Sequence, residues 1–167
     1  MSNLQKLDAV IERIVNKSTP VSIELACRDV DLDQVGSNGQ TPLMVAASEG
    51  QLAAAEQLVR CGASVNVFAG FTNSTPLHQA AGEGHAPLVR FLLSQGADIN
   101  AESKGSVTPL MVAAAWGQLD VVRLLLESGA DWSRTDDRGG NATDSAREKG
   151  EDLVANFIET WIANHNP

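Results

Sequence analysis

Aromatic residues are scarce in this sequence of 167 residues, which contains four Phe, three Trp and no Tyr. A core with so few rings has to be filled by Leu, Val, Ile and Ala, which favours thin layers of small helices. No stretch approaches the roughly 18 consecutive apolar residues that a membrane-spanning helix needs. The apolar share of 43% and the charged share of 20% are typical of a soluble globular protein.

Basic residues are also few, because 12 Lys and Arg stand against 21 Asp and Glu and leave a net charge of −9. Phosphate backbones are bound by clusters of Lys and Arg, and the sequence contains no such cluster. The charge therefore argues against nucleic acid and anionic membranes as partners. It favours a protein partner with a basic contact surface.

Residues that carry chemistry are rare and scattered. The two cysteines, Cys27 and Cys61, and the three histidines, His78, His85 and His165, form no cluster with metal-ligand spacing. A catalytic His needs a nucleophile or carboxylate fixed beside it, and no such pairing is evident. The glycines do not form a nucleotide-binding loop. We therefore predict two reduced thiols, no catalytic residue, no metal and no cofactor.

The first 15 residues give no sign of a secretory signal. Lys6, Asp8, Glu12 and Arg13 interrupt the apolar residues that a signal peptide would need in an unbroken run. We therefore expect the chain to be cytoplasmic.

A seven-residue string returns at a nearly fixed spacing. It begins at Thr41, Thr75 and Thr108 and reads TPLMVAA, TPLHQAA and TPLMVAA, so the spacings are 34 and 33 residues. Two glycines follow each copy at matching places. They are Gly50 and Gly62, Gly84 and Gly96, and Gly117 and Gly129. Three copies in one register indicate a repeat protein.

Each part of this unit has a physical reason. Thr followed by Pro is a helix N-cap before the one helical position where Pro is harmless. Leu, Ala and Ala then fall at i, i+3 and i+4, which places them on one face of a short helix. The first Gly ends that helix in the left-handed conformation. A second apolar face, at Leu119, Val122 and Leu125 in the third copy, predicts a second helix.

Over residues 36–150 this pattern resembles the ankyrin repeat, with its T-P-L-H-x-A-A signature. The resemblance implies an all-α ankyrin-repeat solenoid, in which helix-turn-helix pairs stack and are joined by β-turn or hairpin-like loops. Two copies depart from the family by carrying Met44 and Met111 where it has His, and His78 alone keeps that residue. In the family this His makes structural hydrogen bonds, so we expect its absence to loosen a turn locally and leave function intact.

The repeat predicts one domain of five helix pairs. The last pair carries Glu159 where earlier copies have apolar residues, as a capping unit exposed to solvent would. Trp132 and Trp161 occupy positions that are expected to be apolar and buried. The expected divisions are an irregular N-terminal cap at 1–35, repeats at 36–69, 70–102 and 103–135, and a C-terminal capping repeat at 136–167.

The ankyrin resemblance also implies where a partner would bind. In that architecture the turn tips and the exposed residues of the first helix line a concave surface. The residues that we expect to contact a partner are Asn38, Gln40, Ser48, Glu49, Phe68, Phe71, Thr72, Glu83, Lys104, Val107, Trp116 and Arg138.

Trp116 is the most conspicuous of these residues, because stacking requires no indole there and Trp is enriched at binding hot spots. The alternative is an indole that lies flat on its own repeat. Phe68 and Phe71 belong to a turn lengthened by one residue, where they either contact a partner or pack across the hairpin. Glu49 and Glu83 occupy the same position of two adjacent copies, so they should form a short acidic row.

Three classes of function follow from these observations. The leading interpretation is a scaffold or adaptor, a monomer that docks one protein in its concave face. The alternative is an inhibitory or regulatory subunit of an enzyme, similar to an antitoxin or immunity protein, whose acidic side chains block a basic active site. A stand-alone enzyme is disfavoured by the absence of a catalytic constellation.

Overall fold

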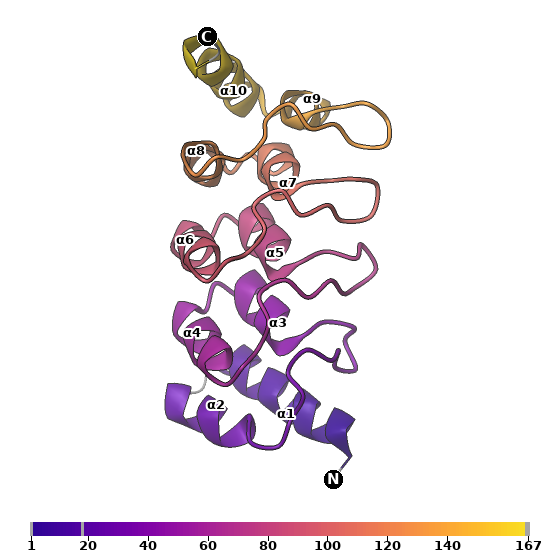
Figure 1. Cartoon of the computed structure of the whole chain (residues 1–167), viewed down its shortest axis with the longest axis vertical. Coiled ribbons are helices and arrows are strands. Elements are labelled where there is room, and N and C mark those ends of the chain that lie inside the picture. Colours follow the sequence, from indigo (N-terminus) through magenta and orange to yellow (C-terminus); the bar gives the residue numbers. More distant parts are fainter. Residues whose placement is uncertain (1, 18, 166–167) are drawn as a thin grey trace.

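The computed structural model describes residues 2–17 and 19–165, which contain ten helices and, as β-structure, one isolated bridge. The inner helices, with odd numbers, form one column, the outer helices, with even numbers, form a second, and loops project beyond the inner column (Figure 1). This arrangement confirms the predicted all-α stack of helix pairs. The bounds are α1 Asn3–Val15, α2 Pro20–Ala26, α3 Pro42–Ser48, α4 Leu52–Arg60, α5 Pro76–Gly82, α6 Ala86–Ser94, α7 Pro109–Ala115, α8 Leu119–Glu127, α9 Ala142–Glu148 and α10 Asp152–His165.

The inner helices from α3 to α9 begin at polar N-caps. The Thr41 and Thr108 hydroxyls each accept a hydrogen bond at 3.3 Å from the backbone N–H three residues later. In α9, Asn141 takes the place of the Thr and accepts from the N–H of Asp144 at 3.1 Å. A proline occupies the first turn of α3, α5 and α7, where its missing N–H costs nothing. Each inner helix from α3 onward is seven residues long.

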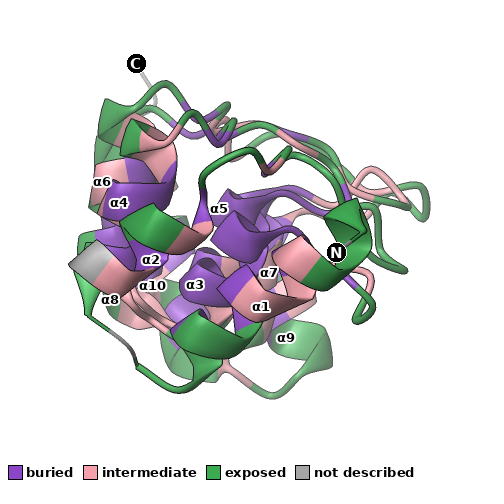
Figure 2. Cartoon of the chain, turned by 90° about the horizontal axis from the view of Figure 1, so that it is seen from below, coloured by how far each residue is buried: buried purple, intermediate pink, exposed green. Residues whose placement is uncertain are grey.

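The core runs without interruption along the stack, from Val10 in α1 to Ile158 in α10. Each inner helix packs against the next inner helix and against its own outer partner. Seen along the stack, the buried residues lie between the two helix columns, and exposed residues dominate the loops (Figure 2). Within the described residues, no helix has both the length and the apolar character to cross a membrane.

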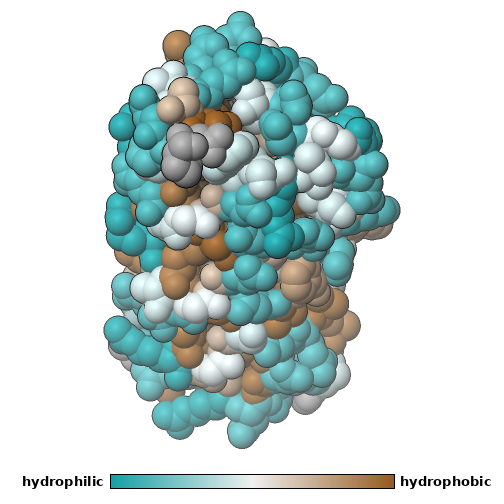
Figure 3. All heavy atoms as spheres, turned by 45° about the horizontal axis from the view of Figure 1, so that its top comes forward, coloured by the Kyte–Doolittle hydropathy of each residue, from teal (hydrophilic) through white to brown (hydrophobic). Residues whose placement is uncertain are grey.

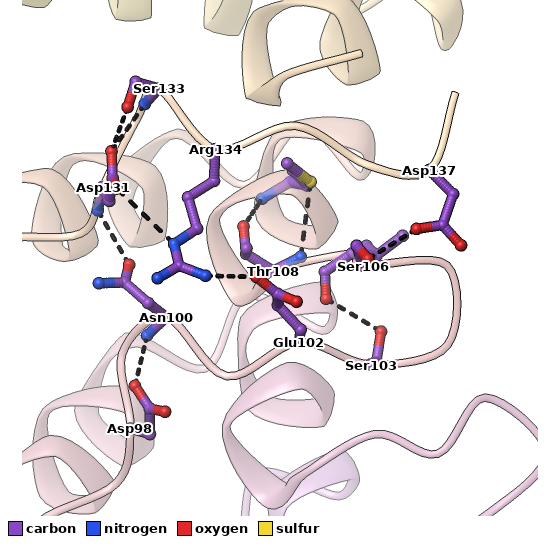
Figure 4. Close-up of polar contacts among 12 residues, drawn as sticks. Asp98, Asn100, Glu102, Ser103, Ser106, Thr108, Asp131, Ser133, Arg134 and Asp137 are labelled. Carbon is purple, nitrogen blue, oxygen red and sulfur yellow. Dashed lines mark hydrogen bonds and ion pairs between the residues drawn. The ribbon is translucent and has the colours of Figure 1, made fainter. Parts of the chain in front are cut away.

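A first series of hydrogen bonds joins each unit to the next at the turn after the outer helix. A side-chain oxygen accepts a hydrogen bond from a backbone N–H one unit later, as Figure 4 shows for Asn100 and Asp131. The pairs are Asp33 with the N–H of Ser64 at 2.7 Å, Asn66 with that of Asp98 at 2.9 Å, and Asn100 with that of Asp131 at 2.9 Å. These polar residues are therefore structural parts of the repeat.

A second series starts from the N-cap of each outer helix. Each of these side chains contacts a carbonyl oxygen at the end of the inner helix of the preceding unit. The side chains are the amides of Gln51 and Gln118 and the ring of His85. These contacts are Gln51 to Ile14 at 2.5 Å, His85 to Ser48 at 3.0 Å and Gln118 to Gly82 at 2.9 Å. The fourth position in the series is Glu151, whose carboxylate lies against Gly117 as His85 lies against Gly50. An ionised carboxylate has no proton to donate, so the series ends there.

The last helix pair exposes polar groups. Glu159 is exposed and pairs with Arg147, and hydrophilic residues cover much of this end of the molecule (Figure 3). Trp132 and Trp161, which were expected to be buried, pack against the core but are only half-buried. Trp132 occupies the place of the smaller Val65. The Trp161 ring is partly covered by His165, which stacks on it with ring centroids 3.9 Å apart.

The two thiols are both free. Cys27 is buried, and this burial, aided by the neighbouring Cys61, raises the pKa of the Cys27 thiol to about 12. A thiol with so high a pKa is almost entirely protonated at neutral pH and is a poor nucleophile.

Removal of residues 136–167 tests whether the last pair acts as a cap. We expect the truncated chain to bind a hydrophobic dye and to aggregate, because the face of α7 that packs against α9 becomes exposed. Size-exclusion chromatography with dye fluorescence measures both effects. A monomeric truncated chain with an unchanged melting temperature would show that this unit is dispensable.

Replacement of Glu151 by Gln tests the second hydrogen-bond series. An amide at this position can donate to the carbonyl group at the end of α7, as Gln118 does one unit earlier, so we expect a gain of about 1 kcal/mol in the free energy of unfolding. Urea denaturation measures it. Glu24→Gln removes the same charge at an exposed position of α2 and serves as the control. Equal effects of the two substitutions would contradict the interpretation.

Candidate functional site

The loops that project beyond the inner helices close as short hairpins. In three of them a backbone N–H donates to the carbonyl oxygen four residues later, over 2.8 to 2.9 Å. The donors are the N–H groups of Gly36, Ser103 and Asp136. In the fourth, Ala69 and Ser74 exchange two hydrogen bonds of 3.0 Å across five positions. The extra residue of the longer repeat therefore lies at this tip, as the sequence predicted.

The two phenylalanines near this tip differ in exposure. Phe71 is fully exposed, so the alternative that it packs across the hairpin is wrong. Phe68 precedes the bridge and is 42% exposed. Between this hairpin and the previous one lies a hollow of about 300 Å³, whose lining includes Val35, Asn38 and Phe71.

The later hairpins are tied to one another. The backbone N–H of Lys104 donates to the carbonyl oxygen of Thr72 at 2.8 Å, and that of Asp137 donates to Gly105 at 3.0 Å. The Ser106 hydroxyl also donates to the Asp137 carboxylate at 2.6 Å (Figure 4). These contacts hold the second, third and fourth hairpins in a fixed relation.

A second hollow, of about 330 Å³ and here called the central hollow, lies between the α5 and α7 units. Its walls come from these inner helices and from the hairpins that precede them. Five of the residues predicted to contact a partner line it: Thr72, Glu83, Lys104, Val107 and Trp116. The stack thus brings together residues that are spread over two repeats in the sequence.

A third hollow, of about 220 Å³, lies on the α9 side of Trp116 and is here called the C-terminal hollow. It shares Val107, Val112 and Trp116 with the central hollow and adds the predicted residue Arg138. The Arg138 guanidinium is already paired, with Asp136 at 3.2 Å and with Glu148 at 3.3 Å. A hydrogen bond from the Gly140 backbone N–H, aided by those from the Arg138 backbone N–H and guanidinium, lowers the pKa of Asp136.

The remaining predicted residues lie at the N-terminal end of the same side. Asn38 and Gln40 belong to the first hairpin, and Ser48 and Glu49 lie at the C-terminal end of α3. None of these four lines the central hollow.

Trp116 sits at the C-cap of α7, and the equivalent C-caps of α3, α5 and α9 carry Glu49, Glu83 and Lys149. The predicted acidic row is therefore two residues long and continues as an indole and a lysine. Trp116 is 68% exposed, which leaves most of the indole available for contact.

Gly82 lines the central hollow and lets Val112 and Trp116 approach α5 closely, a feature that sequence reasoning did not anticipate. A Cβ at this helical position would lie 3.0 Å from Val112 Cγ1 and 3.6 Å from Trp116 Cδ1. The equivalent residues of the other units are Ser48, Ala115 and Glu148, so the comparison of copies held a signal. Gln79 and Val112 also line the hollow and were not predicted, although they share one repeat position and are both half-buried.

His78 lies buried at the base of the central hollow. Its Nε2 contacts the carbonyl oxygen of Val107 at 3.0 Å, so Nε2 carries the proton, and Nδ1 accepts from the backbone N–H of Thr75 at 3.2 Å. Burial lowers the pKa of His78 and keeps the ring neutral. Both ring nitrogens are committed to the fold, which supports the structural role that the ankyrin resemblance implied.

The described residues contain no group of three or more His, Cys, Asp or Glu side chains that could hold a metal ion.

Replacement of His78 by Met, the residue at Met44 and Met111, tests this role. Near pH 7.5 we expect a loss of about 1 kcal/mol in the free energy of unfolding, because the bond to Val107 disappears. A folded-state pKa below the ordinary value of about 6.5 means that the contribution of His78 is complete above that pH and is lost as the pH falls.

The difference between the wild type and His78→Met should therefore shrink from pH 7.5 to pH 5. Urea denaturation at each pH measures this difference. The two proteins have the same carboxyl groups, so the contribution of those groups cancels when the two are compared. A difference that stays constant over this range would contradict a neutral, buried His78.

Comparison with known proteins agrees with this geometry. A family described as ankyrin repeats (3 copies) matches residues 69–136, and the single ankyrin repeat matches residues 38–68. A search of the curated proteins found no match. Ankyrin repeats generally mediate protein–protein interaction, and the family is typically non-catalytic. Since the two matches together cover more than half of the sequence and the structure repeats the same unit, the chain belongs to the ankyrin-repeat family.

Proposed function

We propose that this chain is a non-catalytic adaptor that docks a partner protein on the side formed by the inner helices and the hairpins. The central hollow and the indole of Trp116 form the middle of the docking surface. The observation that carries the proposal is the juxtaposition, in one hollow, of five of the residues that were predicted to contact a partner.

The exposure of Trp116 supports this choice of centre. An indole offers a large apolar area with few rotatable bonds, so little conformational entropy is lost when a partner covers it. Trp116 is 68% exposed and separates the central hollow from the C-terminal hollow. A partner that fills both hollows would bury the ring on both sides.

The charge distribution supports a partner with a basic contact surface. Among the described residues, Glu49 and Glu83 form no ion pair within 4.0 Å, and both are exposed. The net charge of −9 adds a long-range field of the same sign. Association should therefore slow as the salt concentration rises.

We also propose that the chain acts as a monomer with a cap at each end. Residues 1–35 would close the stack before the α3 unit, and residues 136–167 would close it after α8. A stack that is closed at both ends does not extend by stacking on a second copy.

Affinity capture from source cells, followed by quantitative mass spectrometry, tests the proposal with two matched variants. Trp116→Ala should lose the captured partner, since truncation of a central Trp costs about 2 kcal/mol or more, roughly 30-fold in affinity. Leu153→Ala removes an apolar side chain that is 80% exposed in α10 and should capture the partner like the wild type.

Melting temperatures of the variants must match that of the wild type. A partner that depends on Leu153 and tolerates Trp116→Ala would overturn the proposal and point to the outer helices. An activity assay on a captured enzyme then separates an adaptor from an inhibitory subunit.

A further inference from the structure

The central hollow combines an aromatic face with hydrogen-bond acceptors. Trp116, Val107 and Val112 give it an apolar wall, and Glu83 contributes a carboxylate. The Gln79 amide donates its Nε2 proton to the Ser74 hydroxyl at 2.9 Å, which leaves its carbonyl oxygen as a second acceptor. A ligand that fits this lining has a flat apolar face and several donors at its edge.

Glu83 is the charged group that selects the ligand. It lies at the C-cap of α5, next to Gly82, and forms no ion pair within 4.0 Å among the described residues. A carboxylate and an exposed indole together attract a cation in two ways. The carboxylate attracts it by charge, and the ring attracts it through its quadrupole. A guanidinium uses both, because its plane stacks on the ring while its N–H groups reach the carboxylate.

Gly82 lets the α7 side chains approach α5 closely. A Cβ at this position would lie 3.0 Å from Val112 Cγ1, closer than a comfortable contact, and 3.6 Å from Trp116 Cδ1. The equivalent position carries a side chain in the other units, at Ser48, Ala115 and Glu148. The central hollow lies beside this close contact, with Val112 and Trp116 as its apolar wall.

Lys104 restricts the ligand further. It lines the same hollow, is exposed and forms no ion pair within 4.0 Å among the described residues. A run of several basic residues would be repelled by this ammonium group. A single arginine meets less of this repulsion than a basic run does, and an acidic neighbour of that arginine can pair with Lys104.

We infer that the central hollow receives one arginine side chain of the partner protein, with its guanidinium stacked on Trp116 and paired with Glu83. The aliphatic part of the arginine packs against Val112 over Gly82. This inference rests on the proposed function and adds to it the side chain that the site recognises.

The experiment uses a displayed library of random nonapeptides, selected on the full chain. Each selected peptide is synthesised with its arginine intact and with citrulline, which has a similar shape and no charge, in its place. We expect the selected peptides to share an arginine, and citrulline to weaken binding at least about tenfold. Lysine at the same position should also weaken binding, because an ammonium cannot stack as a guanidinium does.

Three variants locate the arginine. In Glu83→Gln the ratio between the arginine and citrulline peptides should fall several-fold, to the level that stacking on Trp116 alone supports, whereas in Glu49→Gln, one unit away, it should persist. Gly82→Ser copies Ser48, and its Cβ presses on Val112 at the wall of the hollow, so it should weaken the arginine peptide about tenfold; the melting temperature is measured beside it. A selection without a common arginine, or an arginine preference that is undiminished in Glu83→Gln, would overturn the inference.

The two failures are distinguishable. If Trp116→Ala abolishes capture of the cellular partner while the selection yields no shared arginine, the inference fails and the proposed function stands. If Trp116→Ala leaves capture unchanged, the proposed function itself fails.

Discussion

Close stacking of alanine faces is the constraint on which the rest of this structure depends. The paired alanines of the inner helices, Ala46 and Ala47, Ala80 and Ala81, and Ala113 and Ala114, have no exposed surface. Small side chains let seven-residue helices approach closely, and each unit buries its apolar face only against its neighbours. Helices this short are unstable alone, so the stack and its inter-unit hydrogen bonds have to form together.

The same constraint decides where a binding site can form. Stacking occupies the Leu, Ala and Pro positions of every unit and leaves the hairpins and the ends of the inner helices free to vary. Gly82 in one unit and Trp116 in the next then line the central hollow between α5 and α7. Because the hairpins on either side are joined by the bond from Lys104 to Thr72, the hollow has a fixed outline.

The sequence predicted the helix pairs, the lengthened turn and the exposure of Trp116, because the repeat register assigns each of these to a known place. It did not predict the hollow, since cavity shape depends on which residues of two adjacent units face each other. Gln79 and Val112 were missed for this reason. Trp132 was expected to be buried, but register alone does not show whether an indole fits a place that accommodates Val65.

The central claim is that a partner binds on the hairpin side, over the central hollow. Amide and indole NMR spectra of the labelled chain, recorded as the captured partner is added, test it most directly. The account predicts the largest shifts at the Trp116 indole and at the backbone amides of Gly82 and Lys104, with little change at Phe91 and Leu153 on the outer helices. Shifts that are confined to the outer helices would contradict it.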